Sequence, residues 1–272
     1  PQTCRLCQAA CQPQADETEM AMMMNTALCR DCHSSLADHP WRCYCCALPL
    51  ASVDTDLCGE CLRRPPAFTR SITACDYQAP ASQLIQRFKY QRQLADGSLL
   101  CQRLLRRIQQ QYHPQTLPSA LVAVPNHWRR QLSRGYNQAA WLTQQLSCEL
   151  KIPLITPLKR HTYSHAQQGL GRTERLHNLR NSFSGSRQLT RNPELLTGLH
   201  LALVDDVVTT TATSATISAI LLRSGASRVD VWSLARTPKP KPPKNRPNTK
   251  QTTPHDLTVT INQQGLPTPI DA

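Results

Sequence analysis

The sequence from Leu199 to Thr213 reads Leu-His-Leu-Ala-Leu-Val-Asp-Asp-Val-Val-Thr-Thr-Thr-Ala-Thr. Its short apolar start is typical of a buried strand in a parallel sheet. Two adjacent carboxylates, Asp205 and Asp206, end the predicted strand, and a helical pattern follows until Gly225. Val229, Val231 and Leu234 alternate, which predicts the next strand. The stretch is therefore a βαβ unit, whose polar turn lies at the edge where open α/β sheets bind ligands.

The polar turn predicts a binding site for a phosphorylated sugar. Small hydroxyl residues at a helix start offer a phosphate their own donors, the backbone N–H groups and the positive end of the helix dipole. Asp205 and Asp206 can accept hydrogen bonds from sugar hydroxyls or hold Mg²⁺. The alternative is an Asp pair that caps a helix and binds nothing. We prefer the ligand site because two unpartnered carboxylates at a strand end are costly.

These residues resemble the ribose-phosphate loop of the type I phosphoribosyltransferases. That motif has four apolar residues, two acids, two apolar residues, Thr-Thr, a small residue that is nearly always Gly, any residue, and Thr. The resemblance implies an α/β fold with a central parallel sheet flanked by helices, and phosphoribosyl pyrophosphate with Mg²⁺ as the ligand. It implies catalytic roles for Asp205 and Asp206. It also implies ligand-binding roles for Thr209, Thr210, Thr211, Ala212 and Thr213.

Thr211 departs from the motif, because it stands where the family has Gly. Glycine serves where a loop needs a positive φ or a very close approach of phosphate. A β-branched residue at this position is expected to impair the site.

The charge of the chain is unevenly spread over its 272 residues. Residues 1–62 carry three Arg and eight acids, a net charge of −5, whereas residues 63–237 carry 23 basic and eight acidic residues, a net charge of +15. The remainder adds +3, which gives the total of +13. A region this basic predicts polyanionic partners such as phosphates or nucleic acid. No run is long and apolar enough for a membrane span and no signal peptide is recognised, so we expect a cytoplasmic protein.

Ten of the 13 cysteines precede residue 62, and eight of them form four Cys-x-x-Cys pairs. Two such pairs supply the four thiolates of a tetrahedral zinc site. Sequential pairing predicts two structural zinc sites; a secreted disulfide scaffold and redox pairs are the alternatives. Cys11 and Cys45 fall outside the spacing and are possible substitute ligands. The predicted ligands are Cys4, Cys7, Cys29, Cys32, Cys43, Cys46, Cys58 and Cys61.

The central region offers a second half for the phosphate site. A strand predicted from Ala120 to Val124 is followed by a basic stretch and a helix from Ala139 to Leu150. Arginine forks suit pyrophosphate, and a glycine allows a tight turn. A basic face that touches only water is the alternative. The residues assigned to the pyrophosphate are Arg129, Arg130, Arg134, Gly135 and Asn137. Further on, the polar stretch from Tyr163 to Gly171 is typical of a lid or a binding loop.

The order of these features resembles the ComF/GntX family, which is linked to natural competence and to the use of external DNA. The resemblance is carried by the double zinc ribbon, Lys89-Tyr90, the basic stretch from Arg129 to Asn137 and the acidic loop from Val204 to Thr213. It covers about residues 1–237. Ala47 departs from it, because the second knuckle usually has Gly there. The resemblance implies a ligand-binding role for Lys89. It also implies cytoplasmic handling of incoming single-stranded DNA, with a helicase and a recombination-loading protein as partners.

Three parts follow: a double zinc ribbon (1–62), a phosphoribosyltransferase-like domain (63–237) and a basic tail (238–272) whose composition predicts disorder. The first interpretation is a competence protein that binds single-stranded DNA and phosphoribosyl pyrophosphate. The second is an active phosphoribosyltransferase, but no pocket for an acceptor base is recognisable. A zinc-ribbon regulator that reads duplex DNA is a third option, although no recognition helix is evident.

Overall fold

We describe a computed structural model of the chain for residues 2–11, 28–36, 39, 41–126, 135–161 and 181–239. Residues Pro1–Pro238 form one compact unit, and of the residues after it only Lys239 lies in the described ranges. Within these ranges we find no helix with the length and hydrophobicity that a membrane span requires. The predicted lid and nearly all of the predicted basic tail lie outside the described residues.

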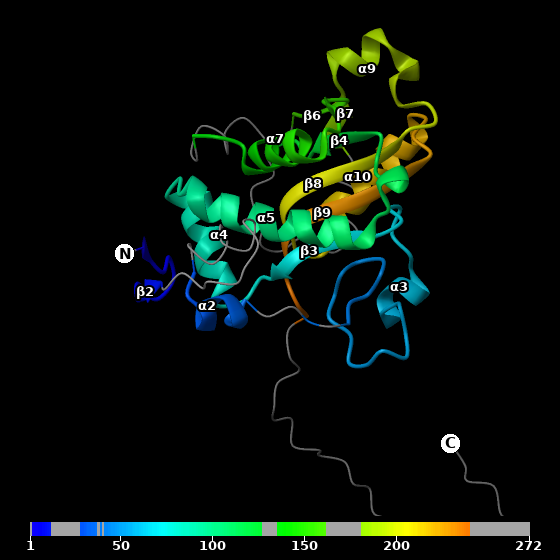
Figure 1. Cartoon of the computed structure of the whole chain (residues 1–272). Helices are drawn as coiled ribbons and strands as arrows, with labels where there is room; N and C mark the ends of the chain where they lie inside the picture. The colour runs from blue at the N-terminus through cyan, green and yellow to red at the C-terminus, as the bar shows by residue number, and fades with distance from the viewer. Residues whose placement is uncertain are drawn as a thin grey trace, which may run out of the picture. The chain divides into compact units, whose positions relative to one another are not determined.

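The centre of the first unit is a five-stranded sheet in the order β3-β9-β8-β4-β5 (Figure 1). All neighbouring strands are parallel. The strands are β3 (Ser71–Asp76), β4 (Ala120–Ala123), β5 (Leu154–Ile155), β8 (His200–Val208) and β9 (Arg228–Arg236). A separate antiparallel pair joins β6 (Leu158–Arg160) to β7 (Phe183–Gly185). The predicted α/β class with a parallel sheet is thus confirmed.

Helices cover both faces of the sheet (Figure 1). One face is covered by α4 (Ala81–Tyr90), α5 (Leu94–Gln111) and α7 (Gln138–Leu150), and the other by α10 (Ala212–Arg223). The shorter elements are α9 (Arg187–Arg191) and the 3₁₀ turns η1 (Pro114–Thr116) and η2 (Pro193–Leu196). The predicted strand from Ala120 to Val124 and the predicted helix from Ala139 to Leu150 correspond to β4 and α7, and the predicted βαβ unit corresponds to β8, α10 and β9. Helix α10 ends before Gly225, whose φ is 104°.

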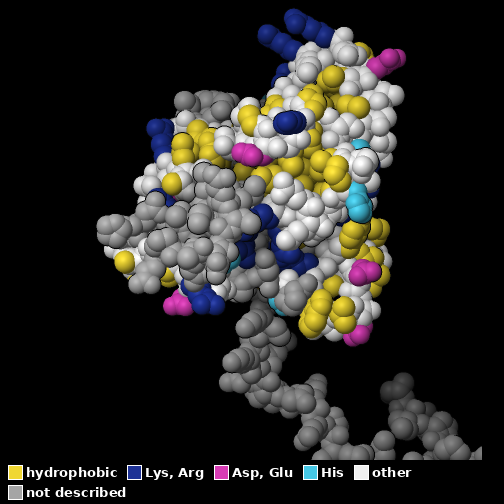
Figure 2. All heavy atoms as spheres, viewed as in Figure 1, with side chains coloured by type: hydrophobic (Ala, Val, Ile, Leu, Met, Phe, Trp, Pro, Cys, Tyr) yellow, Lys and Arg dark blue, Asp and Glu magenta, His cyan; other side chains and the backbone are white. Residues whose placement is uncertain are grey.

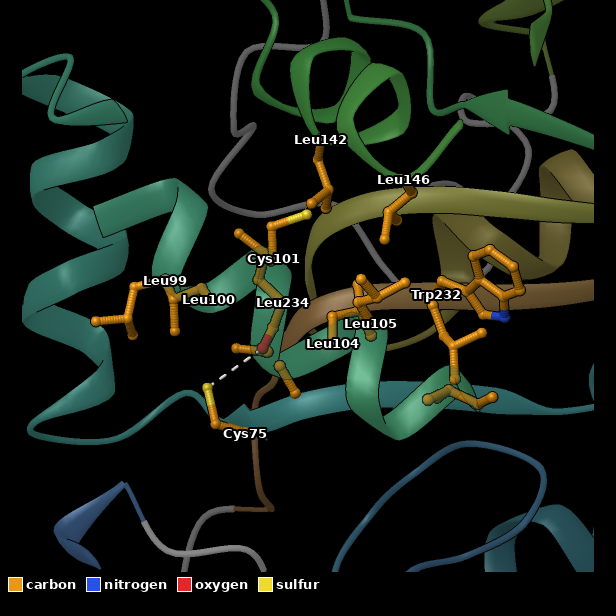
Figure 3. Packing of buried hydrophobic residues seen from close by; sticks show 14 of the residues in the cluster. Cys75, Leu99, Leu100, Cys101, Leu104, Leu105, Leu142, Leu146, Trp232 and Leu234 are labelled. Atoms are coloured by element: carbon orange, nitrogen blue, oxygen red, sulfur yellow. Dashed lines mark hydrogen bonds between the residues drawn. The ribbon is translucent and has the colours of Figure 1, made fainter. Parts of the chain in front are cut away.

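Strand residues alternate between two cores, one on each face. Ala202 and Val204 of β8 belong to the first core, whereas Leu201 and Leu203 belong to the second. In the first core, side chains of α5 and α7 converge on Trp232 and Leu234 of β9 (Figure 3). This double burial explains the continuous apolar run from Leu201 to Val204 in β8. In β9, by contrast, the buried Asp230 and Ser233 interrupt the apolar residues.

Strand β8 is longer than the sequence predicts. The two carboxylates do not end it, because Val207 pairs with Ala235 and Val208 pairs with Arg236. The ladder to β9 therefore continues for two residues beyond Asp206. Asp205 and Asp206 therefore lie within the paired part of β8, where the hydrogen bonds of the sheet fix their backbone.

The amino-terminal segment contains two copies of one turn. Residues 2–11 form the hairpin of β1 (Gln2–Thr3) and β2 (Ala10–Cys11), and residues 42–49 form a similar turn closed by the Arg42–Pro49 bridge. After each turn, the second Cys pair lies on a short helix, α2 (Arg30–Ser35) or α3 (Gly59–Arg63). The residue after each Cys-x-x-Cys turn has a positive φ, 63° at Gln8 and 56° at Ala47. This geometry explains why glycine is usual at the position of Ala47.

A buried acid ties three neighbouring strands together near their amino ends. Asp230 of β9 is fully buried and contacts Arg70 at 3.3 Å, His200 of β8 at 2.9 Å and Tyr112 at 2.5 Å. Burial alone would raise the pKa of Asp230, but hydrogen bonds from His200, Tyr112 and Arg228 lower it below its ordinary value. The network fixes the strand register at the edge opposite the acidic loop.

Candidate functional site

Asp205 and Asp206 lie side by side near the carboxyl end of β8. Both are partly buried, and the Asp205 carboxylate accepts a hydrogen bond of 2.8 Å from the Asp206 backbone N–H. The Lys89 ammonium lies 3.0 Å from a carboxylate oxygen of Asp206. The side chains of both partners are about one-seventh exposed, at 13% for Lys89 and 14% for Asp206. The structure thus brings together three of the predicted site residues.

Lys89 comes from the last turn of α4, and residues at the start of α7 and just before it hold that turn in place. The Tyr136 hydroxyl donates to the Phe88 carbonyl, and the Gln138 side-chain amide donates to the Lys89 carbonyl at 3.2 Å. The Phe88 ring also packs against the rings of Tyr136 and Trp141, at centroid distances of 5.7 Å and 5.2 Å. The end of α4 and the start of α7 are therefore bonded to each other beside the carboxylates.

The electrostatic balance of the pair favours a proton on Asp205. Burial and the charge of Asp206 raise the pKa of Asp205 to about 7, against the opposing effects of the Asp206 N–H, Lys89 and Arg160. Arg160 is the last residue of β6, and its guanidinium lies 5.3 Å from the centre of the Phe183 ring. A bound cation would offset the repulsion from Asp206 that disfavours ionisation of Asp205, so the pair has the charge that suits a cation site.

The connection from β8 to α10 has the conformation that the loop motif predicts. Thr209, Thr210 and Thr211 form the turn, and Ala212 and Thr213 open the helix. Thr211 has φ 60° and ψ −4°, a left-handed conformation that glycine adopts most easily. Its hydroxyl donates to the Thr210 carbonyl at 2.6 Å and does not cap α10. The first N–H groups of α10 therefore have no side-chain cap among the described residues, and such groups are donors that can bind an anion.

The neighbouring strand β4 supplies the other side of the site. From β4 the chain passes through α7 to β5, and from β8 it passes through α10 to β9, so the connections of two adjacent strands diverge. Ala123 of β4 lies beside Val204, one residue before Asp205. Ligands of open α/β sheets bind at such switch points.

Only part of the predicted pyrophosphate loop is described. Gly135 has φ 78°, and a Cβ there would lie 1.4 Å from the guanidinium of Arg92. Asn137 caps α7 by accepting from the Ala140 N–H, and it also accepts a hydrogen bond of 2.9 Å from Asn126. Asn126 and Asn137 thereby close the base of the loop. Arg129, Arg130 and Arg134 lie outside the described residues.

The eight predicted cysteine ligands form two clusters in sequential pairing. One contains Cys4, Cys7, Cys29 and Cys32, and the other contains Cys43, Cys46, Cys58 and Cys61. Within each cluster the four sulfur atoms lie within 4.8 Å of one another. Sulfur distances of 3.5 Å from Cys7 to Cys29 and 3.7 Å from Cys46 to Cys58 agree with the spacing of about 3.8 Å around a tetrahedral zinc with Zn–S bonds of about 2.3 Å.

The surroundings of the sulfur atoms also suit a metal. The Cys58 backbone N–H donates to the Cys43 sulfur at 3.3 Å. A hydrogen bond from Cys46, with backbone donors, lowers the pKa of Cys43 to about 4 despite burial. Burial raises the pKa of Cys4, but backbone N–H groups outweigh it and lower that pKa to about 6. Each cluster therefore stabilises a thiolate, the form that binds zinc.

Cys11 and Cys45 lie outside both four-sulfur clusters. Cys11 belongs to β2, and the Cys45 thiol is 3.9 Å from the Phe68 carbonyl. Burial raises the pKa of Cys45, which disfavours the thiolate. Both clusters therefore consist of the Cys-x-x-Cys residues, and neither Cys11 nor Cys45 replaces one of them.

Sequence reasoning missed two arginines near the acidic loop. Arg160 faces the Asp205 charge from β6, and Arg236 ends β9 beside the last residue of β8. Neither lies in a local motif with phosphate-binding character. A possible signal for Arg236 was its position, because a charged residue that directly follows a buried strand in a parallel sheet lies at the ligand-binding edge.

Comparisons with known proteins agree with this organisation. The chain is 36% identical over 212 residues to competence protein F of Haemophilus influenzae, and the aligned region covers 77% of this chain and 90% of that protein. It is 35% identical over 219 residues to DNA utilization protein YhgH of Escherichia coli, with the same coverage of both chains.

No family model matches the chain. Among solved structures, a purine phosphoribosyltransferase from Pyrococcus horikoshii aligns with 52% of this chain and 82% of its own length, at 13% identity and a TM-score of 0.32. The two curated relatives are similar along nearly their whole length. The chain therefore belongs to the family of competence protein F and the DNA utilization protein YhgH.

Proposed function

We propose that this protein takes part in the use of incoming DNA in the cytoplasm, and that its acidic loop binds phosphoribosyl pyrophosphate with Mg²⁺. The observation that carries the proposal is the carboxylate pair beside Lys89, at the switch point of the sheet and next to the uncapped start of α10. A phosphorylated ribose has a diol for the carboxylates and a phosphate for the helix start.

The ligand would be held from both sides of the switch point. Thr209 to Thr213 would bind the ribose phosphate, and Asp205 with Asp206 would hold the diol and Mg²⁺. Lys89 would contact the ligand once Mg²⁺ takes over part of the Asp206 charge. Gly135, Asn137 and the three arginines Arg129, Arg130 and Arg134 would hold the pyrophosphate, with Arg92 packed against Gly135.

Single-stranded DNA is the second proposed ligand. The net charge of +15 over residues 63–237 supports it, and Lys and Arg side chains gather near the middle of the face shown in Figure 2. Tyr90 and Leu94 are exposed at the α4–α5 turn, close in sequence to Lys89. A helicase and a recombination-loading protein are the partners that this role would require.

Transfer of the phosphoribosyl group is the second candidate activity. The pKa of about 7 at Asp205 favours it, because a group that titrates near neutral pH can act as a general base. In that case Asp205 and Asp206 would be catalytic, and the arginines would hold the leaving pyrophosphate. Release of pyrophosphate on addition of a nucleobase would distinguish transfer from binding.

We also propose that both cysteine clusters hold structural zinc. Metal analysis of the purified protein should give about two equivalents, because each cluster supplies the four thiolates of a closed site. Cys58→Ser should lower the value to about one, and Cys148→Ser, at an exposed cysteine outside the clusters, should leave two. A value near zero with eight reactive thiols would contradict the proposal.

Calorimetric titration should show that phosphoribosyl pyrophosphate binds with Mg²⁺ and that the variant with Asp205→Asn and Asp206→Asn has lost most of the affinity. Hydrogen bonds to charged groups are worth roughly 1.5–3 kcal/mol each, so losing two should weaken binding at least about tenfold. Asp54→Asn, at an exposed aspartate of the second cysteine module, is the matched control. Equal affinity of the double variant and the wild type would reject this site.

Thr211→Gly should tighten binding in the same titration, because the threonine side chain crowds the phosphate. Fold stability should change little, since the left-handed strain of about 1–2 kcal/mol is offset by the extra freedom of glycine in the unfolded chain. Thr211→Ala separates the two effects, because it keeps a Cβ and removes the hydroxyl. If both variants bound more weakly, the hydroxyl would be a phosphate ligand and the crowding account would be wrong.

Affinity for a single-stranded oligonucleotide should fall steeply with salt, by roughly tenfold or more between about 50 and 200 mM, because phosphate contacts release counterions. Sequence preference should be weak, because the chain has only three Phe for stacking besides its Tyr and Trp. A duplex of equal length is the competitor. Stronger binding of the duplex would favour a regulator that reads duplex DNA. Affinity that does not change with salt would contradict binding through phosphate contacts.

A further inference from the structure

The last residue of β9 is a buried arginine with four carbonyl partners. Arg236 is 4% exposed, and its guanidinium donates to the carbonyl oxygens of Cys46 at 2.8 Å, Val208 at 3.2 Å and Thr237 at 2.9 Å. It also donates to the Thr209 carbonyl. A planar fork with five N–H groups can serve several acceptors at once, which a lysine cannot do with the same geometry.

These carbonyl groups belong to two different parts of the molecule. Cys46 is a member of the second cysteine cluster, whereas Val208 ends β8 and Thr209 begins the acidic loop's threonine turn. Cys46 and Arg236 are 190 residues apart in the chain. One side chain therefore joins the backbone of a metal knuckle to the backbone of the proposed phosphate loop.

The groups that could balance the charge of Arg236 are the sulfur atoms of the second cysteine cluster rather than carboxylates. Among the described residues, no carboxylate lies within ion-pair distance of its guanidinium. Burial lowers the pKa of Arg236, and the nearby sulfur groups of Cys46, Cys58 and Cys61 oppose that effect. Four thiolates around Zn²⁺ carry a net charge of −2, so a loaded cluster supplies the counter-charge that this cation requires.

We propose that Arg236 is a positioning residue through which the second cysteine cluster, when loaded with metal, fixes the Thr209–Thr213 loop. For its effect on phosphoribosyl pyrophosphate, this inference rests on the proposed function. Loss of the metal frees Cys46 to move, and the contacts of Arg236 with Val208 and Thr209 then lose their anchor. Because coupling between two sites is reciprocal, a ligand in the loop retains the metal.

The first experiment is hydrogen exchange, which needs no ligand. In Arg236→Met, the peptide that covers Thr209 to Thr213 should exchange about tenfold faster than in the wild type. Arg236→Lys keeps the charge but not the fork and should lie in between. The control is Arg223→Met, an exposed arginine at the end of α10, which should leave the loop unchanged. Equal exchange in all four proteins would overturn the inference.

The second experiment uses the unmodified protein, so it holds even if Arg236→Met does not fold. Removal of metal by a chelator should speed exchange of the Thr209–Thr213 peptide in the wild type, and Cys32→Ser, which lowers metal content at the first cluster, should not. Alkylation of Cys58 and Cys61 during chelation should be about fivefold slower with phosphoribosyl pyrophosphate than with ribose. Loop exchange that ignores the metal would overturn the inference.

The outcomes separate this inference from the proposed function. If phosphoribosyl pyrophosphate does not bind the wild type, the proposed function fails, while loop exchange still decides the role of Arg236. If it binds the wild type and Arg236→Met equally and the loop exchanges equally, the inference fails and the proposed function stands. Weaker binding by Arg236→Met, together with faster loop exchange, supports both.

Discussion

Two carboxylates lie side by side near the carboxyl end of β8, whose residues from Leu201 to Val204 are buried between two cores. Repulsion between the two carboxylates and their loss of hydration favour protonation. Lys89, 3.0 Å from Asp206, opposes this effect at Asp206, whereas the pKa of Asp205 is raised. Burial of two adjacent carboxylates costs stability. This cost is understandable if the carboxylate pair binds a cation and the hydroxyl groups of a ligand.

The two cysteine modules brace this place from different sides. At the first, Arg5, next to Cys4, forms an ion pair of 2.5 Å with the buried Asp96, which also binds Arg87 of α4 at 2.7 Å. That contact fastens the helix that carries Lys89. At the second, Arg236 fastens the end of β8 to Cys46. Structural metal sites do no chemistry themselves, and here each cysteine module is tied to an element that carries residues of the candidate site.

Local patterns made much of this predictable. The Cys-x-x-Cys spacing gave the cluster membership, and the Asp-Asp and Thr run gave the loop, because each depends on neighbours in sequence. Lys89 was expected only through family resemblance, since its contact with Asp206 depends on how α4 packs. The Arg236 contact and the charge of Arg160 near Asp205 depend on long-range packing, so no local pattern indicated them. The glycine that usually stands at the position of Thr211 left two explanations open, a positive φ or a close approach of phosphate, and Thr211 has the positive φ.

The most direct test is an NMR titration of the carboxyl carbons of Asp205 and Asp206, with and without Mg²⁺ and phosphoribosyl pyrophosphate. In the free protein one carboxyl should titrate near pH 7, because Asp205 stays protonated below its raised pKa. Bound Mg²⁺ and ligand favour the ionised pair and should lower that pKa, with release of a proton near neutral pH. If both carboxyl groups titrated near pH 4 and the ligand changed neither, the carboxylate pair would not be a cation and ribose site.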